Sequence, residues 1–251
     1  MEASPVTAER YRALRGLHDA LTQRLHGSVV RRALDETATK LGLREQGRVV
    51  IDQQLERAIV LECALYDYAV SGTTAVARMA ARPPEGLGDD QRMLLSAMRG
   101  ARVTVFEVVG RTPPFGVTVH DLLGCDTFVL ADLALSEAAE PGDLAMARLL
   151  RFDEFAMTTG VPLDAPRFAL GLIKRAGALP ATAWAPKPRA QIATNLYRLA
   201  LSTEEQVKAQ LASMALNGPD PLSLALRKAL LTSTAMPAGG ELAMARDRTR
   251  R

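Results

Sequence analysis

Histidine and cysteine, the side chains most often used for metal binding and nucleophilic catalysis, are scarce in this 251-residue chain. His18 and His26 stand eight residues apart, about 80° around a helix axis, and lie too far apart along that axis to share a metal ion. Cys63 and Cys125 fall in different predicted elements. We interpret them as two buried, unreactive thiols in a reducing cytoplasm, with a disulfide between them left open.

A third histidine, His120, is followed directly by Asp121. Adjacent His and Asp residues form part of the metal site of HD-type phosphohydrolases, but those sites need further ligands carried by helices. Here the doublet ends a predicted strand, where successive side chains point to opposite faces. We therefore predict a structural role for Asp121, whose carboxylate would cap the turn that leads to Gly124.

Carboxylates on the third predicted helix are the next candidates. Asp52 and Glu56 are spaced by four residues and could act together on one face. Glu62 and Asp67 lie off that face, and no Glu-x-x-His pattern of a di-iron bundle occurs. We interpret these carboxylates as solvated surface charges.

Two glycines, Gly110 and Gly116, enclose a short loop that superficially resembles a phosphate-binding turn. Pro113 and Pro114 within it have no backbone N–H to offer a phosphate, and no Gly-Lys-Ser/Thr follows. No dinucleotide fingerprint and no Gly-x-Ser-x-Gly elbow occurs either. The sequence therefore predicts no catalytic residue, no metal site and no cofactor.

The composition is that of a globular protein, with 48% hydrophobic and 24% charged residues, and it excludes a disordered or fibrous chain. The 26 arginines against 5 lysines suggest a GC-rich bacterial genome. The N-terminal residues lack the apolar core of a secretory signal, and no stretch has the roughly 18 apolar residues that a membrane span needs. We expect a cytoplasmic protein with no membrane partner.

Hydrophobic periodicity divides the chain into helical, β-rich and helical parts. Leu14, Leu21 and Leu25 recur at helical spacing near the start, whereas from Arg102 the period changes from 3.6 to 2. We predict an α+β fold composed of a helical domain (1–100), a small antiparallel β-module (101–162), a bundle of C-terminal helices (163–235) and a disordered basic tail (236–251).

The β-module is expected to contain five strands, separated by turns rich in glycine and proline. Because short consecutive strands cannot be parallel without crossover helices, we predict that all five pair antiparallel. Gly124, Gly142 and Asp143 are assigned structural roles in the turns. The strands are expected at 102–109, 116–119, 127–130, 144–152 and 155–158, and the C-terminal helices at 165–177, 189–201, 202–217 and 221–232.

Three motifs stand out in the β-module: Val-Phe-Glu-Val-Val at 105–109, Asp-Leu-Leu-Gly at 121–124 and Gly-Asp-Leu-x-x-Ala-Arg-Leu-Leu at 142–150. With them, the stretch 94–164 resembles a small β-module of uncharacterised bacterial proteins, in which a helical N-terminal part precedes the strands. Some of those relatives carry a zinc motif like that of the SecA C-terminus. No such motif occurs here, since the cysteines are far apart and no histidine follows His120. The resemblance implies a fold and no activity.

The net charge of +3 hides a segregation along the chain. Residues 101–160 contain four Lys and Arg against nine Asp and Glu, a net charge of −5, and residues 161–240 contain nine against four, a net charge of +5. Either the basic helices pack on the acidic β-module, which we favour, or they face an acidic partner. The candidate interaction surface consists of Lys174, Arg175, Arg189, Arg198 and Lys208.

From these observations we predict a non-catalytic binding or adaptor module with an unknown protein partner. Nucleic-acid binding through the basic C-terminal helices is the second choice, although only Trp184 and Tyr197 could stack on bases there. A metal-dependent hydrolase with a site not visible in the sequence is the third.

Overall fold

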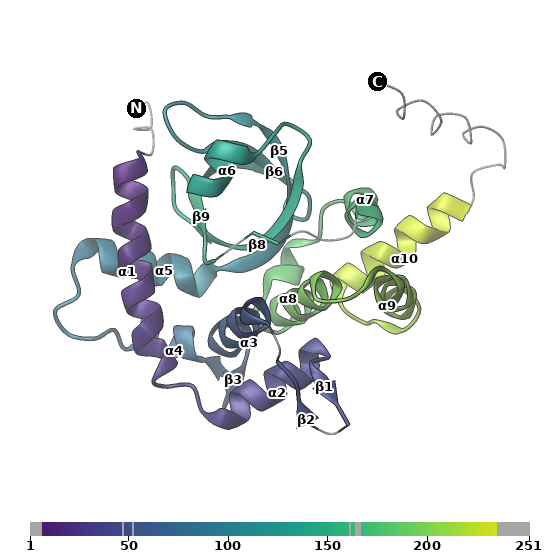
Figure 1. The fold of residues 1–251 in the computed structure, drawn as a ribbon, viewed down its shortest axis with the longest axis horizontal. Coiled ribbons are helices and arrows are strands. Elements are labelled where there is room, and N and C mark those ends of the chain that lie inside the picture. Colours follow the sequence, from purple (N-terminus) through teal and green to yellow (C-terminus); the bar gives the residue numbers. More distant parts are fainter. Residues whose placement is uncertain (1–6, 47, 52, 161, 164–166, 235–251) are drawn as a thin grey trace.

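The computed structural model describes residues 7–46, 48–51, 53–160, 162–163 and 167–234. Within these residues, helices lie at both ends of the chain and a β-barrel lies between them, as Figure 1 shows, so the predicted α+β class is confirmed. The predicted basic tail and Asp52 lie outside the described residues.

The N-terminal part consists of helices joined by short loops and two small hairpins. Thr7 begins the first helix, where its side chain accepts a hydrogen bond from the backbone N–H of Arg10, and Gly42 ends the second with a φ of 84°, in the left-handed region. The hairpins were not predicted, because strands of two residues leave no alternating pattern. The elements are α1 (Ala8–His26), α2 (Arg31–Leu41), β1 (Arg44–Glu45), β2 (Arg48–Val49), α3 (Gln54–Tyr66), β3 (Ala69–Val70), β4 (Thr73–Thr74), α4 (Ala75–Ala81) and α5 (Asp89–Gly100).

The middle part is a closed five-stranded barrel in the order β5-β6-β7-β9-β8. The purely antiparallel prediction was wrong in one pairing: β7 and β9 run parallel, with Leu130 opposite Ala156. The chain between them contains a helix and a long strand, which together supply the crossover that the sequence reasoning did not find. The elements are β5 (Arg102–Arg111), β6 (Val117–Asp121), β7 (Thr127–Ala131), α6 (Leu133–Ala138), β8 (Leu144–Arg151) and β9 (Ala156–Thr158).

This strand order, with a helix between the third and fourth strands, is the topology of the oligonucleotide/oligosaccharide-binding (OB) fold. OB folds commonly bind ligands on the second and third strands and on the loops between strands 1 and 2 and between strands 4 and 5. Here helix α1 lies beside β9 (Figure 1), and its apolar residues share a cluster with Phe115 of the β5–β6 loop and Ala131 of β7. Tyr11 packs on Phe115 of the β5–β6 loop with 5.4 Å between ring centroids, and Arg15 donates to Thr158 of β9 at 3.0 Å.

Asp121 anchors the turn between β6 and β7. Its fully buried carboxylate accepts the backbone N–H groups of Leu123 at 3.0 Å and Gly124 at 2.9 Å, and the guanidinium of Arg102 at 2.7 Å. A side chain at position 124 would not fit, because its Cβ would lie 2.6 Å from Asp121 Oδ2. The turn before β8 is docked on β5, since Gly142 donates its N–H to the carbonyl of Val108 at 2.8 Å.

The C-terminal part is a group of helices packed on the outer face of the barrel. Its third element begins at Pro186, three residues before the predicted start, because proline is tolerated in the first turn of a helix, where its missing N–H has no intrahelical partner. The elements are α7 (Arg167–Ala176), the 3₁₀ helix η1 (Ala181–Trp184), α8 (Pro186–Ala200), α9 (Glu204–Asn217) and α10 (Pro221–Thr234).

Strand β5 shows why the three parts form one core. Phe106 and Val108 point into the barrel, whereas Val103 and Val105 point outward into an apolar cluster. That cluster also contains side chains from α2, α3 and α7 to α10. Both faces of the strand are therefore buried, and α8 lies where the N-terminal helices, the barrel and the C-terminal helices meet (Figure 1).

Candidate functional site

A fully buried arginine occupies this meeting point. The guanidinium of Arg148 on β8 donates from Nε to Glu62 Oε1 at 2.9 Å and from both terminal nitrogens to the carboxylate of Asp67. It also lies over the rings of Tyr66, 4.8 Å from the centroid, and Tyr197, 6.0 Å from the centroid. We call these five residues the Arg148 cluster.

The Arg148 cluster is held by contacts from all three parts of the chain. Glu62 and Tyr66 belong to α3, Arg148 to β8 and Tyr197 to α8. Glu62 accepts further hydrogen bonds from the hydroxyl of Tyr197 and from Thr159 Oγ1, the latter at 2.6 Å. Both carboxylates therefore accept hydrogen bonds from neighbouring side chains.

Burial shapes the ionisation of the cluster. Burial by itself would lower the pKa of Arg148, but Asp67, Tyr197 and Glu62 raise it well above its ordinary value, so the guanidinium stays charged. Burial raises the pKa of Asp67, and Arg148 opposes that rise. The pKa values of the Tyr66 and Tyr197 hydroxyls are also raised by burial, with Glu62 adding to the effect.

The interpretation of Glu62 and Asp67 as solvated surface charges was wrong. Their side chains are 18% and 6% exposed, and both face Arg148. The signal was present in the sequence, since Glu62 and Asp67 interrupt the longest apolar run and Arg148 interrupts an apolar strand. Charged residues of opposite sign that each interrupt an apolar segment are expected to pair with one another, because an isolated buried charge is strongly unfavourable.

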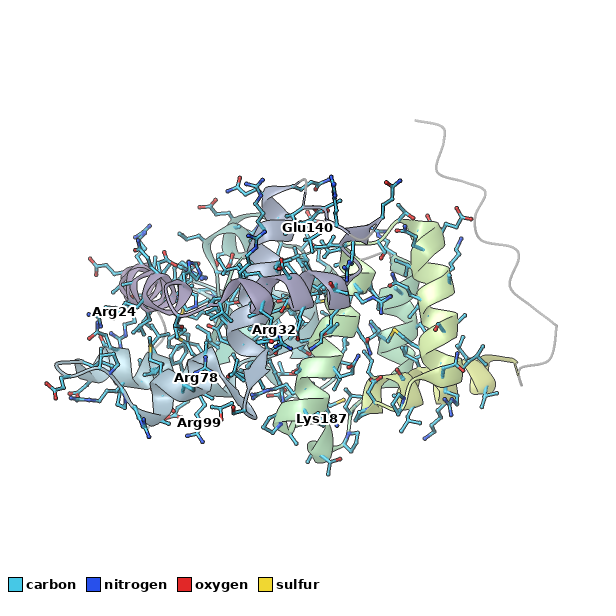
Figure 2. The ribbon with its side chains drawn as sticks, turned by 90° about the horizontal axis from the view of Figure 1, so that it is seen from below. Arg24, Arg32, Arg78, Arg99, Glu140 and Lys187 are labelled. Atoms are coloured by element: carbon cyan, nitrogen blue, oxygen red, sulfur yellow. The ribbon has the colours of Figure 1, made fainter. Side chains whose placement is uncertain are left out.

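A cleft of about 630 Å³ opens above Asp67. We call it the α2–α8 cleft. Figure 2 shows Arg32 of α2 and Lys187 at the start of α8, which both line it. Its volume lies in the range of small-molecule sites. Its lining consists of Arg32, Glu36, Thr37, Lys40, Cys63, Asp67, Tyr68, Ala69, Gly72, Thr74, Pro186, Lys187, Ala190, Gln191 and Thr194.

The charges of the α2–α8 cleft are arranged by depth. Asp67 at the floor is paired with Arg148, which also pairs with Glu62, and Arg32 at the rim is paired with Glu36 at 2.6 Å. Lys40 lies over the ring of Tyr68, 5.6 Å from its centroid, and Lys187 is exposed; no described carboxylate forms an ion pair with either amine. The lining therefore holds three cations against two carboxylates and has a positive net charge, and Lys40 and Lys187 are the cations outside these ion pairs.

The cysteines differ from each other. Cys63 is buried in the wall of the cleft, and burial raises the pKa of its thiol well above its ordinary value, so it is a poor nucleophile at neutral pH. The prediction that Cys125 is also buried was wrong: it is exposed in the tight turn after Gly124, with a φ of 55°. Both thiols are free.

The residues of the candidate interaction surface do not share one set of neighbours. Lys174 of α7 donates to Glu107 of β5 at 2.6 Å, which joins the basic C-terminal part to the acidic barrel. Arg189 is half-buried near Asp67 and donates to the backbone carbonyl of Arg99 at 3.4 Å. Lys208 pairs with Glu204 within α9. Arg175 is exposed and Arg198 half-buried.

Among the described residues, no three His, Cys, Asp or Glu side chains lie close enough together to hold a metal ion. His120 is hydrogen-bonded to Thr127 at 3.1 Å, whereas the adjacent Asp121 points into the protein. No helix in the described part of the chain is long and apolar enough to cross a membrane.

The fold and the site define an α+β protein built on an OB-type barrel, with a polar cleft between its helical parts. The chain belongs to a family of unknown function, DUF7986, whose model matches residues 6–166, more than half of the chain. The predicted resemblance to uncharacterised proteins is thereby confirmed. Comparison with curated proteins and with solved structures gives no match.

Proposed function

We propose that this chain is a non-catalytic binding module of the bacterial cytoplasm and that its α2–α8 cleft holds a small anionic ligand or the acidic side chain of a protein partner. The observation that carries the proposal is the pair of amines, Lys40 and Lys187, at the rim of a cleft whose two carboxylates are already paired with arginines.

Electrostatics favours an anion in this position. Lys40 and Lys187 project from α2 and α8, on two sides of the cleft. A carboxylate or phosphate between them would form charge-assisted hydrogen bonds, about twice as strong as those between neutral groups. The ring of Tyr68 and the methylene groups of Pro186 give the rest of such a ligand an apolar contact surface.

A binding role fits the floor of the cleft better than a catalytic one. The Cys63 thiol, which lines the cleft, has a pKa raised well above its ordinary value by burial and stays protonated at neutral pH. Asp67, the carboxylate at the floor, is held by both terminal nitrogens of Arg148. Groups held in this way position a site but do not exchange protons readily near neutral pH.

Thermal unfolding of the full chain with added anions tests the proposal. The probes are inorganic phosphate, citrate and adenosine monophosphate, and at least one should raise the unfolding temperature in a saturable way. The double variant Lys40→Gln, Lys187→Gln should lose that shift. Arg24→Gln and Arg78→Gln, which remove the same charge from α1 and α4 outside the cleft lining (Figure 2), are the matched controls and should retain it. Equal shifts in all variants would contradict the assignment.

Nucleic-acid binding through the basic C-terminal helices is the second candidate, supported by the +5 charge of residues 161–240. The Lys174–Glu107 contact weighs against it. It would be favoured if nucleic acid co-purified with the protein from its native host, judged by absorbance at 260 and 280 nm, and dissociated with rising salt. Stoichiometric metal in the same preparation would instead favour the metal-dependent hydrolase.

A further inference from the structure

A second hollow lies between α8, α9 and the start of α10. This C-terminal cleft has a volume of about 670 Å³ and lies on residues that the family model does not cover. Its lining combines Pro188, Pro219, Pro221 and Met214 with polar side chains, among them Lys187, Asn195 and Asp220. Such a mixture is typical of sites that bind an apolar molecule and orient it by one polar end.

A small cavity of about 60 Å³ adjoins the C-terminal cleft. Asn195, Ser213 and Met214 line both spaces, and Arg198 and Gln210 complete the cavity wall. A cavity of this size accommodates one small polar group, such as a carboxamide.

Two polar atoms of the cavity wall are buried without a hydrogen-bond partner among the described residues: Arg198 Nε, a donor, and Gln210 Oε1, an acceptor. The nearby amide nitrogens already donate hydrogen bonds. Asn195 Nδ2 donates to Asp220 at 3.2 Å, and Gln210 Nε2 donates to Ser202 at 2.7 Å. Because buried polar atoms in proteins are nearly always paired, a donor and an acceptor left open beside one cavity indicate a ligand group that complements both.

We propose that the C-terminal cleft, which shares Lys187 and Gln191 with the α2–α8 cleft, is a second binding site, for an apolar molecule that ends in an amide. The amide oxygen accepts from Arg198 Nε, the amide N–H donates to Gln210 Oε1, and the apolar body lies against Met214 and the three prolines. A carboxylate of the same size has no proton to donate and leaves Gln210 Oε1 unpaired, which disfavours it even though Arg198 is positively charged.

Calorimetric titration of the full chain with octanamide and with octanoate tests this site. Octanamide should bind once per chain, at least tenfold more tightly than octanoate. Ser213→Trp, at an exposed position that lines both spaces, should weaken octanamide binding at least tenfold. Ala212→Trp, at the adjacent exposed position outside both linings, is the matched control and should leave binding unchanged.

The polar end has its own test. Gln210→Met keeps the size of the side chain but removes the acceptor, and should reduce the preference for octanamide over octanoate to less than threefold. No binding of octanamide at millimolar concentration, tighter binding of octanoate, or equal effects of Ser213→Trp and Ala212→Trp would each overturn the proposal. Circular dichroism verifies that the variants are folded.

Discussion

Arg148 on β8 donates to Glu62 on α3 at 2.9 Å, and through this contact the barrel and the N-terminal helices share one buried charge pair. Asp67, directly after the same helix, accepts hydrogen bonds from the terminal nitrogens of this guanidinium, so two carboxylates share one positive charge. The contact places a polar, rigid floor beneath the α2–α8 cleft.

Removing Arg148 should therefore destabilise the whole chain. In Arg148→Met the carboxylates of Glu62 and Asp67 remain buried without their partner, and breaking a buried pair in this way typically costs about 3–5 kcal/mol. Urea denaturation measures the change in the free energy of unfolding. Arg175→Met, at an exposed position of α7, is the control and should change it by less than about 0.5 kcal/mol. A loss of under 1 kcal/mol for Arg148→Met would contradict the account of the cluster.

Asp121 should be needed for the turn between β6 and β7. Asp121→Asn keeps the shape but removes the charge that Arg102 and two backbone N–H groups share, and we expect a loss of about 1–3 kcal/mol. Thermal unfolding should show the loss clearly. Asp153→Asn, in the exposed loop between β8 and β9, should leave the unfolding temperature nearly unchanged. Similar values for both variants would exclude the capping role.

The C-terminal helices should be coupled electrostatically to the barrel through Lys174 and Glu107. Both side chains are partly exposed, so a double-mutant cycle with Lys174→Met and Glu107→Gln should give a coupling energy of only about 0.2–1 kcal/mol. Because exposed charges are screened, the coupling should fall towards zero in 1 M salt. A coupling of zero at low salt would mean that this contact does not join the two parts in solution.

His18 should make the chain less stable in mild acid. Burial, together with nearby Arg15, lowers the pKa of His18 in the folded protein, whereas in the unfolded chain it is about 6.5. Below about pH 6.5 the unfolded chain therefore binds a proton that the folded chain resists, and the free energy of unfolding falls with pH by up to about 1.4 kcal/mol per unit.

Denaturant titrations at pH 7.5 and pH 5.5 measure this dependence. His18→Gln should reduce the loss of stability between the two pH values, and His26→Gln should reduce it less, because His26 is exposed and its pKa is lowered only by partial burial. If His18→Gln keeps the full loss, another group causes the acid sensitivity.

Much of the fold was predictable because local patterns determine it. The alternation that begins at Arg102 and the turn signals at Gly124 and Gly142 identified the strands to within a few residues. Such local patterns do not determine which strands lie next to each other in the barrel. The parallel pairing of β7 with β9 depends on α6 and β8 lying between them, and α6 is too short to show a helical period.

The candidate site was harder to predict than the fold. Lys40 and Lys187 are 147 positions apart, and only the packing of α8 on α2 brings them to one cleft. Glu62 and Asp67 were interpreted as surface charges and Arg148 was not singled out, although each interrupts an apolar segment. These three charged residues, taken together, would have predicted a buried ion pair, but not its contact with Tyr197 of α8.

Titration of citrate into the full chain by calorimetry, at 20 mM and 200 mM salt, tests the central claim most directly: the α2–α8 cleft binds anions through Lys40 and Lys187. We predict one site per chain, binding that weakens with salt, and a dissociation constant at least about tenfold higher in the Lys40→Gln, Lys187→Gln variant, equivalent to about 1.4 kcal/mol. No binding to the wild-type chain, or equal dissociation constants for the two proteins, would contradict the claim.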